Sequence, residues 1–275
     1  MKNTQPIPEG EQFRQLQGLS VADARQLIRS GEYSSHTAGI GLGYLQGNLV
    51  ILPADYALDF FRFCQRNPKP CPLVAVSDTG DPMMHTLGAD IDIRTDIPLY
   101  NIYREGELDC QVRDIKDLWQ DDFVTFVLGC SFTFEEALLA GGIRIPHIEA
   151  NSTVPMYRTS FATTPAGPFC GPMVVSMRPM SPADAIRACS ISERFPHAHG
   201  APVHVGAADD IGIKDLLNPD YGDPPVIGEG QTTVFWACGV TPQAAMQSAK
   251  LPICITHAPG RMLISDVPGW AAGGV

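Results

Sequence analysis

The sequence feature that most constrains the fold is residues 124–138, whose pattern predicts a buried strand, a tight turn and a helix. β-Branched and aromatic residues fill its first half, which suits a strand covered on both faces. After a glycine, Cys130 and Ser131 follow at the strand end. Thr133 and Glu136 have the spacing of a capping box, which predicts that a helix begins here. The free amides and the dipole of such a helix end favour anionic groups.

A second segment, residues 232–246, repeats this pattern at a constant offset of 108 residues, so that Cys130 aligns with Cys238 and Thr133 with Thr241. Chance similarity is one explanation, and two βα units of one parallel sheet are the other. Ligands of open α/β sheets gather at the carboxyl ends of strands. The expectation is therefore an α/β fold, with a mostly parallel sheet lobe covered by helices on both faces.

The pattern changes in residues 146–227, where strand-like segments are separated by Gly-Pro turns. One short helix is predicted there, beginning at Ser181 with a proline in its first turn. This pattern of short strands, turns and one helix is typical of a small α+β lobe with an antiparallel sheet. We therefore expect a larger α/β lobe formed by residues 1–145 and 228–275, and a smaller inserted α+β lobe formed by residues 146–227.

The composition is that of a globular protein, with 44% hydrophobic and 18% charged residues in a chain of 275. A formal net charge of -11 argues against nucleic-acid binding and against an anionic membrane surface. The eight cysteines include no Cys-x-x-Cys pair, and no apolar run is long enough to span a membrane. These features predict reduced thiols in the cytoplasm. The acidic net charge is still compatible with a small acidic substrate, because a pocket needs only one or two local cations, and a homodimer stays open.

The two cysteines of the repeat are candidates for chemistry. If both lie at strand ends, Cys130 and Cys238 could act on a substrate together with Ser131, because helix N-termini lower the pKa of a thiol. The alternative is that these small residues merely pack a tight turn, since buried free cysteine is common.

The histidines are candidates for proton transfer rather than for metal binding. His197, His199 and His204 lack the spacing of a metal site, and we expect no metal there. His204 could enter the cleft as an acid or base, or it could be structural. His257 lies on a predicted hairpin near the C-terminus and could reach the same cleft.

Two arginines are candidates for binding a carboxylate. Arg158 follows a proline among apolar residues, where a guanidinium needs an anion, either an internal acid or a ligand carboxylate. Arg94 stands between Asp92 and Asp96 and is expected to pair internally.

Seven motifs together resemble the D-glutamate cyclase family. They are Arg66-Asn-Pro-Lys-Pro-Cys-Pro-Leu, Asp92-Ile-Arg-Thr-Asp-Ile-Pro, Gly129-Cys-Ser-Phe-Thr-Phe-Glu-Glu-Ala-Leu, Val154-Pro-Met-Tyr-Arg-Thr, Gly171-Pro-Met-Val-Val-Ser-Met-Arg-Pro, His199-Gly-Ala-Pro-Val-His and Thr256-His-Ala-Pro-Gly-Arg-Met-Leu. They extend over nearly the whole chain, and as a set they are specific to that family. The resemblance implies a two-part α/β fold and a lyase that removes water, closing D-glutamate to 5-oxo-D-proline.

A mechanism of this kind assigns roles to the candidate residues. The expected catalytic set is Cys130, Ser131, Glu135, His204 and His257, and the expected substrate-binding set is Arg158, Thr133, Arg94, Cys238 and Thr241. Arg158 would hold a carboxylate, amides near Ser131 would stabilise an oxyanion, and either histidine would move the proton, with Glu135 as an alternate.

The absence of Gly-x-Gly-x-x-Gly and of a phosphate-loop Gly-Lys-Ser/Thr predicts that no nucleotide or flavin cofactor is required. Two rival functions stay open. One is a cofactor-independent amino-acid racemase that uses both thiols, and the other is a non-catalytic binder of an acidic metabolite.

Overall fold

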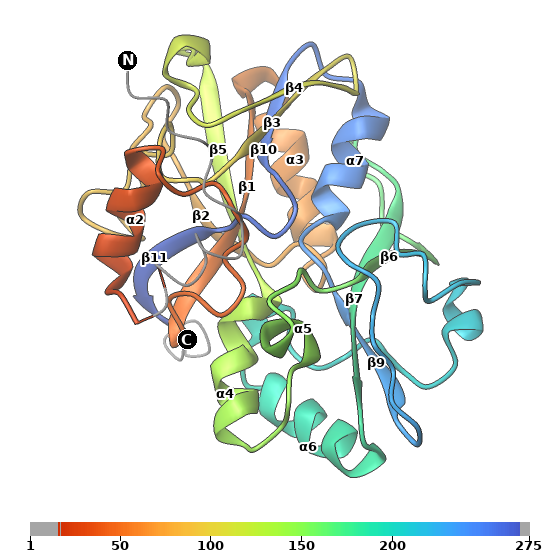
Figure 1. Cartoon of the computed structure of the whole chain (residues 1–275). Coiled ribbons are helices and arrows are strands. Elements are labelled where there is room, and N and C mark those ends of the chain that lie inside the picture. Colours follow the sequence, from red (N-terminus) through yellow and green to blue (C-terminus); the bar gives the residue numbers. More distant parts are fainter. Residues whose placement is uncertain (1–15, 17, 270–275) are drawn as a thin grey trace.

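The computed structural model describes residue 16 and residues 18–269, and this part of the chain contains two antiparallel sheets (Figure 1). The larger sheet is formed by β1 (Tyr44–Pro53), β2 (Leu73–Val76), β3 (Tyr100–Arg104), β4 (Glu107–Val112), β5 (Phe123–Gly129), β10 (Cys254–His257) and β11 (Leu263–Pro268). Its order is β2-β5-β1-β10-β3-β4, and β11 pairs with β1. The smaller sheet is formed by β6 (Met156–Ala162), β7 (Pro172–Met180), β8 (His204–Val205) and β9 (Thr232–Ala237), in the order β6-β7-β9-β8.

The expected parallel sheet is wrong, because every strand pairing among the described residues is antiparallel. The fold is mixed α+β. The two strands of the sequence repeat lie in different sheets, since β5 pairs with β1 and β9 pairs with β7. A continuous apolar run shows that a strand is covered on both faces, but it does not specify the direction of the neighbouring strand.

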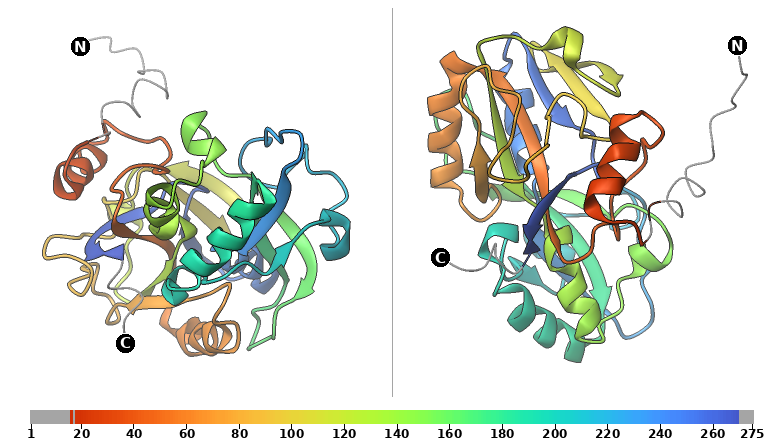
Figure 2. Two further views of the ribbon diagram at one scale, coloured as in Figure 1. Left: turned by 90° about the horizontal axis from the view of Figure 1, so that it is seen from below. Right: turned by 90° about the vertical axis from the view of Figure 1, so that its left-hand side faces the viewer.

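The helices cover the sheets on several sides. They are α2 (Val21–Arg29), α3 (Ala54–Arg66), α4 (Glu135–Ala140), α5 (Pro146–Glu149), α6 (Pro182–Ser192) and α7 (Thr241–Ala249), with short 3-10 turns at η1 (Lys116–Leu118), η2 (Ser131–Phe134), η3 (Pro196–Ala198) and η4 (Ala208–Ile211). The predicted helix at Ser181 is confirmed, since the Ser181 hydroxyl accepts the Asp184 amide at 3.1 Å. Figure 2 shows α3 and α2 on opposite sides of the larger sheet.

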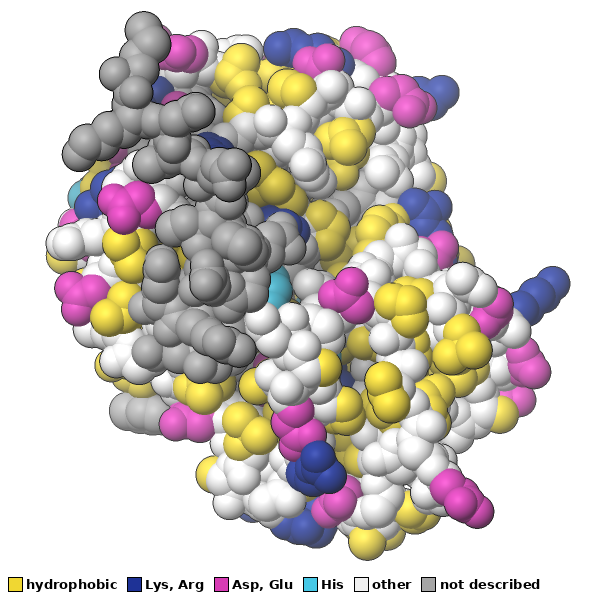
Figure 3. Space-filling view, in the orientation of Figure 1, with side chains coloured by type: hydrophobic (Ala, Val, Ile, Leu, Met, Phe, Trp, Pro, Cys, Tyr) yellow, Lys and Arg dark blue, Asp and Glu magenta, His cyan; other side chains and the backbone are white. Residues whose placement is uncertain are grey.

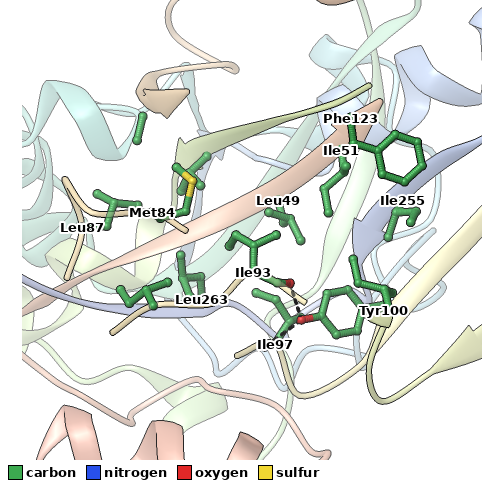
Figure 4. Packing of buried hydrophobic residues seen from close by; sticks show 14 of the residues in the cluster. Leu49, Ile51, Met84, Leu87, Ile93, Ile97, Tyr100, Phe123, Ile255 and Leu263 are labelled. Atoms are coloured by element: carbon green, nitrogen blue, oxygen red, sulfur yellow. Dashed lines mark hydrogen bonds between the residues drawn. The ribbon is translucent and has the colours of Figure 1, made fainter. Parts of the chain in front are cut away.

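The core of the larger sheet has two faces because successive residues of a strand point in opposite directions. On β1, Leu49 and Ile51 enter one apolar cluster, whereas Val50 and Leu52 enter another. Figure 4 shows the first cluster, where Leu49 and Ile51 lie near Tyr100 and the loop before it. Residues of α3 and α7 pack in the second cluster. Both faces of β1 are therefore buried, which is consistent with its apolar sequence.

Along the chain, the strands change from the larger to the smaller sheet between β5 and β6, and they return to the larger sheet between β9 and β10. The larger sheet takes its strands from residues 44–129 and 254–268, and the smaller sheet takes its strands from residues 156–237. The lobe boundaries near residues 145 and 228 stay a prediction. Helices α4, α5 and α6 lie beside the smaller sheet (Figure 1). No helix in the described part of the chain is long and apolar enough to cross a membrane.

Candidate functional site

The two turns of the sequence repeat have the same local geometry, although they belong to different sheets. In each turn the threonine amide donates to the carbonyl of the cysteine three residues earlier, at 3.1 Å for Thr133 and 3.0 Å for Thr241. Each threonine hydroxyl also accepts an amide from the neighbouring strand, that of Gln46 at 3.1 Å and that of Val174 at 3.0 Å. These threonines therefore anchor each turn to its own sheet.

The predicted capping box is wrong for the first turn. The 3-10 turn η2 stands between β5 and α4, and α4 begins at Glu135 without a side-chain cap. The hydroxyl of Thr133 already accepts the Gln46 amide. The Phe132 amide hydrogen-bonds the Cys130 thiol, and the Thr133 amide bonds the Cys130 carbonyl. These two amides are thus occupied within the turn, where the oxyanion site was expected.

Cys130 and Cys238 lie in one apolar cluster where the two sheets meet. They are 7% and 9% exposed, and they pack with Met156, Val174 and Met262. We call this apolar cluster the thiol cluster. Burial raises the pKa of the Cys130 thiol well above its usual range and that of Cys238 to about 11, in spite of nearby amides. The expected lowering at a helix N-terminus therefore does not occur, and both thiols are protonated at neutral pH.

A buried ion pair lies next to the first turn. Arg178 of β7 donates to Oε1 of Glu135 from Nη2 at 2.5 Å and from Nε at 3.2 Å, and its Nη2 also donates to the Ser131 hydroxyl at 3.0 Å. The guanidinium lies 5.5 Å from the ring centroid of Phe134 and 5.3 Å from that of Trp236. Ser131 and Glu135 are thus joined to a cation that the sequence alone did not single out.

His147 of α5 extends this cluster. Its Nε2 lies 3.0 Å from Oε1 of Glu135, and its ring stacks on that of Phe132. Burial alone would raise the pKa of Glu135, but the attraction of His147 and Arg178 lowers it, so the carboxyl is ionised. The second oxygen of Glu135, Oε2, is fully enclosed and has no hydrogen-bond partner among the described residues.

His204 lies on the opposite face of the smaller sheet from these groups. It pairs with Phe235 across β8 and β9, and its ring packs on that side chain at 5.7 Å. Trp236, the next residue, points to the Arg178 side. The Nε2 of His204 is 2.8 Å from the Ala207 carbonyl. The structure therefore does not bring His204 together with Cys130 or Cys238.

His257 is held inside the larger sheet. Its Nδ1 accepts the Leu49 amide at 3.0 Å, and its carbonyl accepts the Gln243 side-chain amide at 2.9 Å. Burial lowers the pKa of the imidazole to about 4. A neutral ring with one nitrogen hydrogen-bonded to the backbone is suited to a structural role.

The two candidate arginines differ in their partners. Arg94 forms two hydrogen bonds to the carboxylate of Asp92, at 3.0 and 2.8 Å, so it pairs internally as expected. Arg158 donates from Nη2 to the Tyr221 hydroxyl at 2.8 Å and to the Gln247 amide oxygen at 3.1 Å. None of the ion pairs found within the described ranges includes Arg158, and Tyr221 packs against the thiol cluster.

Two adjoining cavities form a cleft beside the thiol cluster. The smaller, of about 320 Å³, is lined by Ser35, His36, Gln111, Asn151, Ser152, Thr153, Gly222, Asp223, Ala258, Pro259 and Arg261. The larger, of about 840 Å³, has His147 in its wall and shares Ser152, Thr153 and Asp223 with the smaller. Ala38, Val154 and Met262 of the thiol cluster are within two positions of residues that line the smaller cavity.

Arg261 is the cation in the wall of the smaller cavity. Its Nε donates to the Ser34 carbonyl at 2.8 Å and its Nη1 to the Pro259 carbonyl at 3.3 Å, which fixes the direction of the guanidinium. Figure 3 shows acidic and basic side chains interspersed over one face of the molecule. Among the described residues, no group of three or more His, Cys, Asp or Glu is placed to hold a metal ion.

Sequence reasoning missed Arg178, His147, His36 and Arg261. Arg178 and Arg261 each lie inside a motif that carried the family resemblance, and this was a usable signal. His147 had none, because its partner Glu135 is 12 positions earlier and becomes a neighbour only when α5 folds back on α4.

Comparison with known proteins gives a consistent result. A model of the D-glutamate cyclase family matches residues 124–266. A relative from Dinoroseobacter shibae, named "Putative hydro-lyase", is 61% identical over 93% of this chain and 85% of its own length. Relatives of the same name from Verminephrobacter eiseniae and Rhodopseudomonas palustris are 59% and 57% identical, over 89% and 95% of this chain and 89% and 96% of their own lengths.

Among solved structures, the crystal structure of a nitrogen repressor-like protein MJ0159 from Methanococcus jannaschii aligns over 86% of this chain and 91% of its own. Its TM-score is 0.38 at 8% identity, a similarity too low to establish a shared fold.

Proposed function

This chain belongs to the D-glutamate cyclase family, and from that premise we propose that it is a hydro-lyase that removes water from a small acidic substrate in the cleft described above. The leading candidate reaction is the closure of D-glutamate to 5-oxo-D-proline. The observation that carries the proposal is the smaller cavity, where Arg261 stands among hydroxyl and amide side chains. Its volume of about 320 Å³ is at the lower end of the range typical of ligand pockets, which suits a substrate of this size.

The reaction sets simple chemical demands. The α-amine attacks the γ-carboxyl carbon, a C–N bond forms, and one carboxylate oxygen leaves as water with two protons that come from the ammonium. The α-carboxylate survives unchanged, so a cation that holds it serves both substrate and product. Holding the flexible chain in the attack geometry supplies a large part of the rate gain.

The direct test is incubation of the purified protein with D- and L-dicarboxylic amino acids and with their hydroxy analogues. Proton NMR follows the disappearance of each substrate and the appearance of the dehydrated product. We expect turnover of at least one acidic substrate, and D-glutamate is the first to try. Binding without any turnover across the panel would instead favour the non-catalytic binder, which thermal stabilisation by D-glutamate or 5-oxoproline would reveal.

The carboxylate clamp can be assigned by comparing two arginines. The variant Arg261→Gln is expected to lower kcat/KM for the acidic substrate about 100-fold, because a charge-assisted hydrogen bond to a carboxylate contributes about 1.5–3 kcal/mol. Arg158→Gln should change kcat/KM much less. Arg66→Gln is the matched control, since Arg66 also donates to a backbone carbonyl, that of Pro165, but from the surface of α3.

Steady-state kinetics on the three variants decides between the sites. A large loss in Arg158→Gln with normal kinetics in Arg261→Gln would move the carboxylate from the smaller cavity to the Tyr221 side of the thiol cluster.

One observation favours the racemase as a second candidate. Cys130 and Cys238 occupy matched turns and pack in the same cluster, as two thiols that exchange a proton with one carbon would require. Their raised pKa values argue against a thiolate at neutral pH in this structure, so dehydration stays the leading function.

Replacing Cys238 with alanine separates the two functions. If dehydration is the activity, Cys238→Ala should keep its rate within a few-fold, because no thiol takes part. If racemisation is the activity, exchange of the α-proton with D₂O should occur in the unmodified protein and disappear in the variant. NMR of D-glutamate in D₂O measures both outcomes, and Cys110→Ala, which changes an exposed cysteine, is the control.

A further inference from the structure

A buried cluster of Arg178, Glu135 and His147 lies next to the turn that carries Cys130. Of these three side chains, that of His147 lines the larger cavity. Arg178 and Glu135 are 1% and 0% exposed and lie in the interior, whereas His147 forms part of the wall of the 840 Å³ cavity. A line of contacts thus runs from the Ser131 hydroxyl through Arg178 and Glu135 to an imidazole that borders an open space.

The two nitrogens of His147 have different surroundings. Nε2 is fully enclosed and lies 3.0 Å from Oε1 of Glu135, a charge contact that does not have hydrogen-bond geometry in this structure. Among the described residues no group hydrogen-bonds Nδ1, so this nitrogen is left for water or for a ligand in the cavity. The ring of Phe132 stacks on the imidazole with 29° between the planes and limits its rotation. A ring with one nitrogen beside a buried carboxylate and the other on the side of a cavity resembles the oriented base of many hydrolytic sites.

Glu135 is equipped to serve as the orienting carboxylate. Arg178 binds its Oε1, and this guanidinium stays charged over the whole working range of pH. The free Oε2 of Glu135 is enclosed without a partner, which is costly for a carboxylate oxygen. Hydrogen bonds of catalytic pairs are often poorly aligned in an unliganded site and become well aligned only when substrate binds.

We propose that His147 is the proton-transfer residue of the site, acting through Nδ1, and that Glu135 is its positioning residue. This inference rests on the proposed function. In the cyclisation, Nδ1 first takes a proton from the substrate ammonium, which frees the nitrogen lone pair to form the C–N bond, and then gives this proton to the departing carboxylate oxygen. The nitrogen loses its second proton to the same oxygen, water leaves, and His147 returns to its neutral form.

Other charged groups line the same cavity as His147. Arg144 and Glu149 flank it on α5 and pair with each other, Asp184 comes from α6, and Asp223 and Glu229 come from the loop before β9. The wall of this cavity thus carries four acids and one base besides His147. Glu135 holds the imidazole from behind at 3.0 Å, so removing its carboxylate should lower kcat by loosening the orientation of the ring rather than by weakening substrate binding.

The experiment compares His147→Gln, Glu135→Gln and the control His85→Gln, which changes an exposed histidine outside the cleft. For His147→Gln we expect kcat to fall about 100-fold or more, with KM within about threefold of the unmodified value. For Glu135→Gln we expect a smaller loss of kcat with KM nearly unchanged, and for Glu135→Asp, which keeps a carboxylate, a partial recovery of kcat. His85→Gln should match the unmodified enzyme in kcat, KM and pH profile.

A measurement without turnover covers variants that fold poorly. Nitrogen-15 NMR of the unmodified protein should show the proton of neutral His147 on Nε2, facing Glu135. Full activity in a folded His147→Gln variant, or a proton found on Nδ1, would overturn the assignment while leaving the proposed function standing. Failure of the unmodified enzyme to dehydrate any acidic substrate would instead overturn the proposed function and the catalytic role of His147 with it.

Discussion

Replacing Arg178 with methionine is expected to lower the free energy of unfolding by about 3–5 kcal/mol at pH 7. The carboxylate of Glu135 would lose its permanent counter-charge in a fully buried position, and the ion-pair partner that remains among the described residues is His147. The Ser131 hydroxyl would lose its donor as well. Denaturation by urea, followed by tryptophan fluorescence, measures the change.

The matched control is Arg187→Met, which removes an exposed arginine paired with Asp184 at 2.8 Å and should cost about 0.5 kcal/mol or less. The double variant Arg178→Met/Glu135→Leu should recover much of the loss, because removing both charges leaves no unpaired ion in the interior. Equal costs for Arg178→Met and Arg187→Met would show that the buried ion pair does not hold the turn in place.

Lowering the pH from 7 to about 4 is expected to destabilise the fold by about 3 kcal/mol for each of two histidines, His199 and His257. Burial lowers the pKa of each from the ordinary 6.5 to about 4. Between these values the unfolded chain binds protons that the folded protein does not. Stability is therefore complete above pH 6.5 and is lost as the pH falls towards 4.

The physical reasons differ at the two sites. Protonation of His257 would cost the hydrogen bond that its Nδ1 accepts from the Leu49 amide. Protonation of His199, whose Nδ1 donates to the Lys69 carbonyl, would add a charge near Lys69 and Arg178. Urea unfolding at half-unit intervals from pH 7 to pH 4.5 tests this.

In that series His257→Gln should flatten the pH dependence by about half, whereas His85→Gln should not change it. A profile in the His257→Gln variant as steep as that of the unmodified protein would show that His257 does not titrate with folding.

The candidate site was only partly predictable from the sequence. The sequence repeat at a 108-residue offset corresponds to two turns of the same local structure, because Thr133 and Thr241 make the same two hydrogen bonds in their turns. The residues that border the cleft come from segments far apart in the chain, such as residues 35–36, 151–153 and 258–261. Their proximity depends on strand pairings such as β1 with β10 and β11, and these pairings leave no local signal in the sequence.

The sequence by itself determined where the chain forms strand, turn and helix near Cys130 and Cys238, and it determined family membership, because side-chain period, turn residues and motifs are local properties. Only the tertiary structure decided that the sheets are antiparallel, that Glu135 pairs with Arg178, and that His204 points away from the thiols. Strand direction and charge pairing depend on long-range contacts whose free energy comes from packing the whole chain.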